Sequence, residues 1–154
     1  MTISLQAAKG GLVMSHIVCA TDFSPHADKA LLTAVEMAKS QVASLTLLHV
    51  VVPHTPLLPG EKPKDSAGLS DHDMAERLRA YMKECYADRL EGLDWRIRLR
   101  RGHTSEEILS FLRQKKADLV VLGGQGLSGM GLVLFGSVAE RVVRRAPCSV
   151  LVVR

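Results

Sequence analysis

Apolar runs and amphipathic segments alternate along the chain. Four short runs, at 16–20, 44–52, 118–122 and 149–153, are rich in apolar residues, which is typical of parallel strands buried on both faces. Between them, apolar residues recur at the spacing of one helix face. The clearest sets are Ala27, Ala30, Leu31, Ala34 and Ala38 after the first run, and Met74, Leu78, Tyr81, Met82 and Cys85 within residues 71–90.

Residues 95–100 follow a different pattern, because apolar and basic residues alternate strictly. Three apolar residues would share one face of a strand, and Arg96, Arg98 and Arg100 would share the other. Charge on one face suits an edge strand. A basic patch for nucleic acid is the alternative, but no aromatic residues interleave with the arginines as stacking platforms. The formal charge of +4 and the pI near 9.2 are too small an excess to argue for a nucleic-acid partner.

Capping residues mark the expected helix boundaries. Ser24 followed by Pro25 is typical of an N-cap and a first helical residue. Capping boxes at 104–107 and 137–140 would open two further helices, and Pro147 would end the last one. Five strands alternating with four helices predict a single-domain, doubly wound, Rossmann-like α/β fold: a five-stranded parallel sheet with helices on both faces. The order of elements alone does not fix the strand order.

Residues 14–154 are expected to form the domain, and residues 1–13 an N-terminal extension with Met14 as an alternative start. No run approaches the roughly 20 apolar residues of a membrane span, so no membrane partner is expected. Three cysteines without a C-x-x-C pair argue against a zinc site or a disulfide framework and favour a cytoplasmic location. Residues 53–70, rich in proline and glycine, predict a long loop that is either a lid or disordered.

The densest glycine segment follows the run 118–122. Five glycines lie between Gly123 and Gly131, and Gly136 immediately precedes Ser137 and a helical pattern. We expect these glycines to adopt positive φ and to turn backbone N–H groups into a concavity. The N-terminus of the following helix adds further N–H groups and a partial positive charge. The pattern therefore predicts an anion site, most often a phosphate site.

The spacing of these residues resembles a known signature. Gly123, Gly126 and Gly136-Ser137 follow the pattern G-x2-G-x9-G-[S/T] of nucleotide-binding universal stress proteins. Three flanking motifs agree with the same family: Ala-Thr-Asp-Phe-Ser around Asp22, Leu-Leu-His-Val ending at Val50, and the C-terminal Ala-Pro-Cys-Ser-Val-Leu-Val-Val. The resemblance covers residues 16 to 154. It implies the adenine nucleotide alpha hydrolase-like strand order 3-2-1-4-5, with ligands beyond the carboxyl ends of the strands.

The resemblance also implies a ligand, an adenine nucleotide: ATP, or else ADP or AMP, with or without Mg²⁺. The glycine backbone would close on the phosphates and ribose, the Ser137 hydroxyl would bind a phosphate oxygen, and the Asp22 carboxylate would accept a hydrogen from the adenosine. The alternative for Asp22 is an ordinary turn residue, and Val50 and Val138 could equally be core residues. The expected nucleotide-binding residues are Ala20, Thr21, Asp22, Val50, Gly123, Gly126, Gly136, Ser137 and Val138.

The strand at 149–153 bears on the expected assembly. In the implied order this short apolar strand is the second edge of the sheet, and an uncovered apolar edge is an aggregation hazard. A two-fold partner that offers the same strand would cover it. The resemblance implies a homodimer of that kind, formed through residues 149–153.

The sequence departs from the family at one place. Relatives usually carry Arg or Lys shortly after the second signature glycine, whereas residues 127–135 contain no charge, so the identity of the nucleotide stays open. No metal ligand or catalytic residue is expected, and no P-loop lysine is present for efficient ATP hydrolysis. The leading hypothesis is an ATP-binding, dimeric stress-response sensor or adaptor. The alternatives are a slow nucleotide hydrolase or transferase that uses the same pocket, and a non-binding dimeric interaction module.

Overall fold

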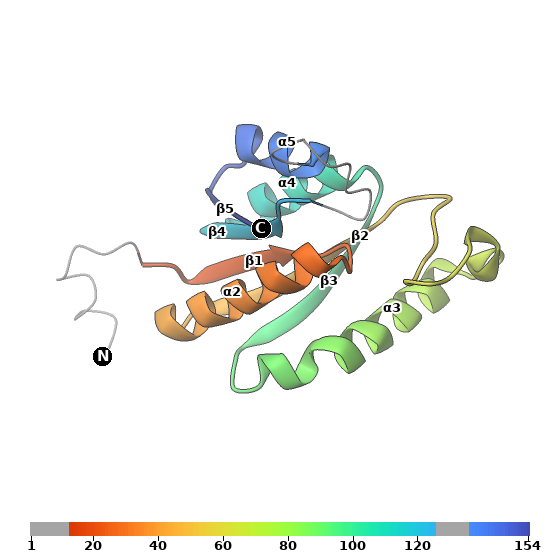
Figure 1. The fold of residues 1–154 in the computed structure, drawn as a ribbon, viewed down its shortest axis with the longest axis horizontal. Coiled ribbons are helices and arrows are strands. Elements are labelled where there is room, and N and C mark those ends of the chain that lie inside the picture. Colours follow the sequence, from red (N-terminus) through yellow and green to blue (C-terminus); the bar gives the residue numbers. More distant parts are fainter. Residues whose placement is uncertain (1–12, 126–135) are drawn as a thin grey trace.

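The computed structural model describes residues 13–125 and 136–154, so Gly126 lies outside the described residues. The chain forms a five-stranded parallel sheet in the order β3-β2-β1-β4-β5 (Figure 1). This order confirms the predicted doubly wound fold. The strands are β1 (His16–Ala20), β2 (Ser44–Val51), β3 (Trp95–Arg101), β4 (Leu119–Gly123) and β5 (Ser149–Val153).

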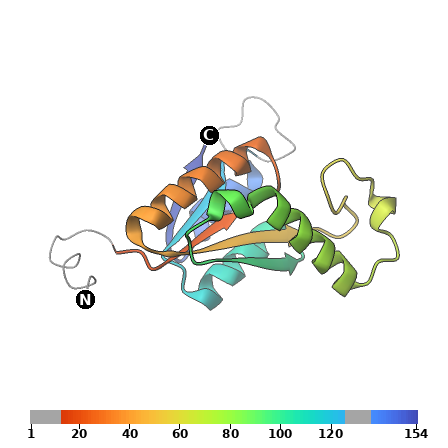
Figure 2. The same cartoon turned by 90° about the horizontal axis from the view of Figure 1, so that it is seen from below.

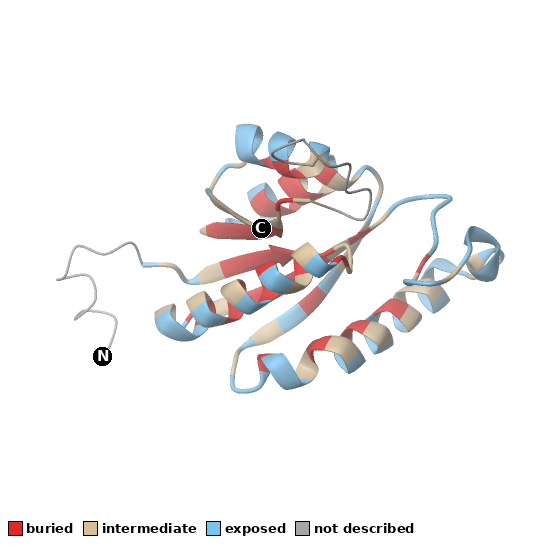
Figure 3. Ribbon diagram, viewed as in Figure 1, coloured by how far each residue is buried: buried red, intermediate tan, exposed pale blue. Residues whose placement is uncertain are grey.

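Helices cover both faces of the sheet (Figure 2). One buried cluster joins the sheet to α2 (Pro25–Gln41) and α3 (Asp71–Tyr86), and a second joins it to α4 (Thr104–Lys115) and α5 (Ser137–Arg145). Alternate residues of β1 enter opposite clusters, so the central strand is buried on both sides. This is why it is an unbroken apolar run in the sequence. Figure 3 shows the buried residues concentrated along the central strands and on the sheet-facing sides of the helices.

The helix starts match the sequence prediction at α2 and at α3, which begins at Asp71. The Ser24 hydroxyl accepts the Ala27 amide at 3.2 Å, and Pro25 is the first helical residue, as predicted. The two predicted capping boxes are wrong by one residue, because Thr104 and Ser137 are the first residues inside α4 and α5. Their N-caps are His103 and Gly136, and neither makes a side-chain capping bond. Backbone contacts fix these starts instead: the Gly102 amide bonds the Val51 carbonyl, and the Gly136 amide bonds the Gly124 carbonyl.

Several strand and helix boundaries differ from the prediction: β3 ends at Arg101 instead of residue 100, and β4 is Leu119–Gly123 instead of 118–122. β2 ends at Val51 instead of residue 52, and the helix predicted over 71–90 ends at Tyr86, where the 3-10 helix η2 (Ala87–Leu90) follows. The loop 53–70 contains the 3-10 helix η1 (Pro63–Ser66), and the ion pair between Glu61 and Arg77 ties this loop to α3. Leu57 is only 4% exposed. The loop is therefore anchored at Leu57 and Glu61, and most of its other residues are exposed.

Over residues 13–125 and 136–154, every helix is too short or too polar to cross a membrane.

Candidate functional site

The described ends of the glycine-rich segment meet at the carboxyl end of β4. The Gly136 amide donates to the Gly124 carbonyl at 2.8 Å, and the Gly124 amide donates to the Val153 carbonyl at 2.7 Å. The first bond holds the start of α5 beside the end of β4, and the second continues the β4–β5 pairing. The end of β4 and the start of α5 therefore lie side by side.

Gly123 is required there by close packing and not by an unusual backbone angle. A Cβ at this position would lie 2.8 Å from the carbonyl carbon of His26 and 3.0 Å from the amide nitrogen of Ala27. Those atoms belong to the first turn of α2, whose backbone has no room to move aside. The prediction of positive φ is wrong at the described glycines of this segment: φ is −66° at Gly136, and Gly123 and Gly124 are outside the positive range.

The N-terminus of α5 presents N–H groups without an intrahelical acceptor beside this point. The first hydrogen bond of the helix runs from the Glu140 amide to the Gly136 carbonyl. The amides of Ser137, Val138 and Ala139 therefore have no intrahelical acceptor. The Ser137 side chain is exposed and, contrary to the prediction, does not cap the helix. Its hydroxyl is thus not committed to the first turn of α5.

Asp22 lies at the carboxyl end of the neighbouring strand β1, in the turn that leads into α2. Its Oδ1 accepts the Ser24 amide at 3.0 Å, and Asp22 takes part in a further interaction. Phe23, between these two residues, has a positive φ of 65°, which costs energy for a residue other than glycine. The side chains of Asp22 and Ser24 thus stabilise a strained turn. The turn-residue reading of Asp22 holds, and its predicted contact with adenosine remains a prediction.

The amide, carbonyl and hydroxyl of Thr21 all contact other protein groups, unlike those of a residue whose polar atoms face a ligand. Its amide bonds the Leu48 carbonyl at 2.9 Å. Its carbonyl accepts from the His49 ring at 2.8 Å, and its hydroxyl accepts the Phe23 amide at 3.1 Å. The hydroxyl also lies 3.4 Å from the Tyr86 hydroxyl. Thr21 therefore positions the turn, and any nucleotide contact by this residue stays a prediction.

The apolar site candidates lie on the α4–α5 side of the sheet. Ala20 and Val50 are 8% and 7% exposed and belong to the buried cluster there, and Val138 packs against it. Their core role is confirmed. Any contact of Val50 or Ala20 with adenine is restricted to the small exposed part of each residue.

The turn at Phe23 makes aromatic contacts that the sequence did not predict. The Phe23 ring lies 4.4 Å from the His49 ring and 5.2 Å from the Tyr81 ring, centroid to centroid. Burial lowers the pKa of His49, although its bond to Thr21 and the nearby Asp22 act in the opposite direction. His49 is therefore a neutral donor to the Thr21 carbonyl. Nothing in the sequence indicates its bond to Thr21 or its pairing with Phe23.

The candidate site has no cluster of metal-binding side chains among its described residues. The described parts of the chain contain no group of three His, Cys, Asp or Glu side chains that could hold a metal ion. The donors near Gly123 and Ser137 are amides and a hydroxyl, which suit phosphate oxygens. This donor set fits a nucleotide phosphate, with any Mg²⁺ carried by the phosphates themselves.

The strand order places the topological switch between β1 and β4, where Asp22 and Gly123 lie. The fold and this site define a doubly wound α/β protein of the class that takes ligands beyond the carboxyl ends of its strands. Within that class, the chain belongs to the universal stress protein family, whose model matches residues 14–154.

Individual relatives agree with the family match. The chain is 35% identical over 139 residues to the universal stress protein in the QAH/OAS sulfhydrylase 3′ region of Thermus aquaticus, covering 90% of this chain and 97% of the relative. The solved structure of UspA from Lactobacillus plantarum superimposes with a TM-score of 0.70 at 27% identity, covering 94% and 100% of the two chains.

Two more distant structures carry ligands. One is a universal stress protein in complex with cAMP, with a TM-score of 0.62 at 22% identity; the match covers 93% of this chain and 99% of that chain. The other is a universal stress protein from Archaeoglobus fulgidus in complex with dAMP, with a TM-score of 0.61 at 22% identity, covering 93% and 100%. At this identity the two structures support the fold of the present chain.

Proposed function

We propose that this chain binds an adenine nucleotide at the carboxyl ends of β1 and β4, as a cytoplasmic, dimeric stress-response sensor or adaptor and not as a fast catalyst. ATP, with Mg²⁺ carried on its phosphates, is the first candidate, and ADP and AMP are the others. The cAMP and dAMP complexes of distant relatives support the adenine class.

One observation carries the proposal: the bond from the Gly136 amide to the Gly124 carbonyl, which holds the first turn of α5 against the end of β4. The amides of Ser137 and Val138, which have no acceptor within α5, then lie on the same edge of the sheet as Asp22. Amides at a helix N-terminus favour phosphate through hydrogen bonds and the helix dipole. This arrangement binds an anion without a cationic side chain, which fits the uncharged residues 127–135.

A pair of substitutions at Ser137 tests the amide contact directly. Ser137→Ala removes the hydroxyl, whereas Ser137→Pro also removes the N–H. Proline is well tolerated at the first helical position, and the preceding residue, Gly136, has the extended backbone that proline requires, with φ −66° and ψ 157°. Loss of a hydrogen bond to a charged phosphate lowers affinity by about tenfold or more.

Isothermal titration calorimetry with ATP, ADP and AMP measures the effect, and circular dichroism checks that both variants are folded. We expect Ser137→Pro to bind ATP at least about tenfold more weakly than Ser137→Ala. Asp22→Ala and Gly126→Val are expected to weaken binding as well. Equal affinities for folded Ser137→Pro and Ser137→Ala would place the phosphates elsewhere.

Turnover distinguishes the alternative functions. We expect ATP hydrolysis by the purified protein to stay at the level of a heat-inactivated sample. Hydrolysis well above that level and lost in Asp22→Asn would support the hydrolase or transferase. A folded wild-type protein that binds none of the three nucleotides would support the non-binding interaction module.

The dimer is proposed through β5, which pairs only with β4 in the described chain and whose residues Val150 to Val153 are partly exposed. An edge of this kind can pair with its two-fold copy. Leu151→Lys adds charge to this strand, and Leu32→Lys, on the exposed side of α2, is the matched control. Light scattering should give a dimer for wild type and Leu32→Lys and a monomer for Leu151→Lys. A dimer in all three samples would move the interface away from β5.

A further inference from the structure

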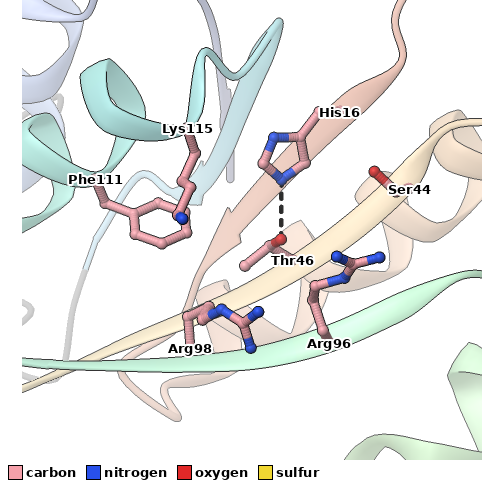
Figure 4. Close-up of a pocket in the computed structure, with 7 residues that line it drawn as sticks. All are labelled: His16, Ser44, Thr46, Arg96, Arg98, Phe111 and Lys115. Atoms are coloured by element: carbon pink, nitrogen blue, oxygen red, sulfur yellow. Dashed lines mark hydrogen bonds between the residues drawn. The ribbon is translucent and has the colours of Figure 1, made fainter.

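A hollow lies over the amino-terminal half of the sheet, remote in the fold from the candidate site at Asp22 and Gly123. Its volume is about 210 Å³, and it is open to solvent over β1, β2, β3 and the end of α4. Figure 4 shows side chains from all four elements around it. The lining residues are His16, Ser44, Thr46, Arg96, Arg98, Phe111 and Lys115.

The alternation of β3 explains why this surface is polar. Ile97 is buried on the α2–α3 side, so Arg96 and Arg98 project from the opposite face and are exposed. On that face α4 covers the inner strands with Phe111, which is 1% exposed, and leaves the edge strand open. The stems of the two arginines and of Lys115 therefore surround a space that no helix fills (Figure 4).

The charges around this hollow are of one sign. Among the described residues, no carboxylate lines it, whereas two guanidinium groups and one ammonium group do. Within residues 13–125 and 136–154, the Arg98 side chain bonds only the carbonyl of Ile97, at 3.0 Å, and Lys115 forms no ion pair. Arg96 pairs with Asp94 at 3.0 Å through one nitrogen, which leaves its other N–H groups available. The lining thus repels cations and attracts anions.

Neutral donors add directionality to this charge. The Nε2 atom of His16 lies 2.9 Å from Oγ1 of Thr46. When Nε2 donates in this contact, the Thr46 hydroxyl hydrogen is available to an anion. The Asp118 carboxylate, near His16, accepts the amides of Ser15 and His16 and the Ser15 hydroxyl through Oδ2, all at 2.8–2.9 Å. Asp118 is not among the lining residues.

We propose that this hollow binds a small anion with more than one phosphate charge, such as pyrophosphate or a short polyphosphate. Planar guanidinium groups bind phosphate oxygens in pairs, and lysine adds a point charge. The volume suits a small ion, and the buried ring of Phe111 leaves no exposed aromatic face for a nucleic-acid base. Since the C-terminal end of α4 carries a partial negative charge, side chains alone supply the attraction.

Amide NMR of the full chain with sodium pyrophosphate as the probe tests this proposal. We expect saturable shifts at Thr46, Arg98 and Lys115, and a dissociation constant that rises with added NaCl. Arg96→Gln with Arg98→Gln should weaken binding at least tenfold. A control with the same loss of charge, Arg89→Gln with Arg113→Gln, changes exposed arginines outside the lining and should stay within twofold of wild type.

Three results would overturn the proposal. Shifts confined to residues 136–139 would assign the anion to the α5 terminus, and equal losses in both double variants would mean unspecific charge attraction. Tighter binding of a single-stranded RNA than of pyrophosphate, lost in Arg96→Gln with Arg98→Gln, would make the surface a nucleic-acid site. Ser137→Pro separates this site from the nucleotide site, because it should leave the pyrophosphate shifts at Thr46 unchanged.

Discussion

Replacing Gly123 with alanine tests the packing argument most directly. The added Cβ would lie 2.8 Å from the His26 carbonyl carbon, 2.9 Å from the His26 Cβ and 3.0 Å from the Ala27 nitrogen. Carbon atoms in contact normally lie about 3.5–4.0 Å apart, so the overlap approaches about 1 Å. The neighbouring atoms belong mostly to the backbone of α2 and cannot rotate away.

We therefore expect Gly123→Ala to lower the free energy of unfolding by about 2–3 kcal/mol, at the upper end of the usual overpacking range. For a chain of this size the melting temperature would fall by about 4–12 °C. Urea unfolding followed by circular dichroism measures the change.

Gly124→Ala is the matched control. Its Cβ would lie 3.3–3.4 Å from the Val152 and Arg154 side chains and the Val153 carbonyl oxygen, two of which are side-chain atoms that can adjust. The expected loss is below about 1 kcal/mol. If Gly123→Ala unfolds like wild type, or if Gly124→Ala is the less stable variant, then close approach to α2 is not what requires glycine at 123.

Three further predictions concern titratable groups. Burial raises the pKa of Asp118, but hydrogen bonds from His16 and Ser15 outweigh it and hold the pKa below its ordinary 3.8; stability should fall as the pH drops below about 4, and Asp118→Asn should flatten that acid limb of urea unfolding. Burial lowers the pKa of His49 from 6.5, so the unfolded chain binds protons first and stability should decline below about pH 6.5. Urea-unfolding midpoints measured against pH should decline less in His49→Gln than in wild type, and an equal decline would contradict this. Burial raises the pKa of Cys19 to about 12; mass spectrometry should find it unalkylated by iodoacetamide at pH 8 until denaturant is added.

Much of the fold could be predicted from the sequence because the burial of each strand or helix determines how many apolar residues it has and how they are spaced. The run around Ile17 and Val18 is apolar throughout because the central strand faces helices on both sides. The strict alternation around Ile97 likewise corresponds to an edge strand with one uncovered face. The strand order came from the family resemblance, since the crossovers that set it leave no local signal in the chain.

The helix starts at Thr104 and Ser137 were predicted less well. Capping boxes are local patterns, whereas both starts are fixed by backbone bonds to distant strands, from Gly102 to Val51 and from Gly136 to Gly124. The reason for Gly123 was also hidden, because a steric contact with α2 looks the same in sequence as a turn that needs positive φ. The bond from the His49 ring to the Thr21 carbonyl depends on the parallel pairing of β1 with β2, which no local pattern around His49 indicates.

The hydrogen bond between the Gly136 amide and the Gly124 carbonyl is made by main-chain atoms alone. No side chain joins β4 to α5 through this bond, so the link can be inherited through changes in sequence that keep the backbone path. Proline at residue 136 is the exception, because it has no amide hydrogen to donate.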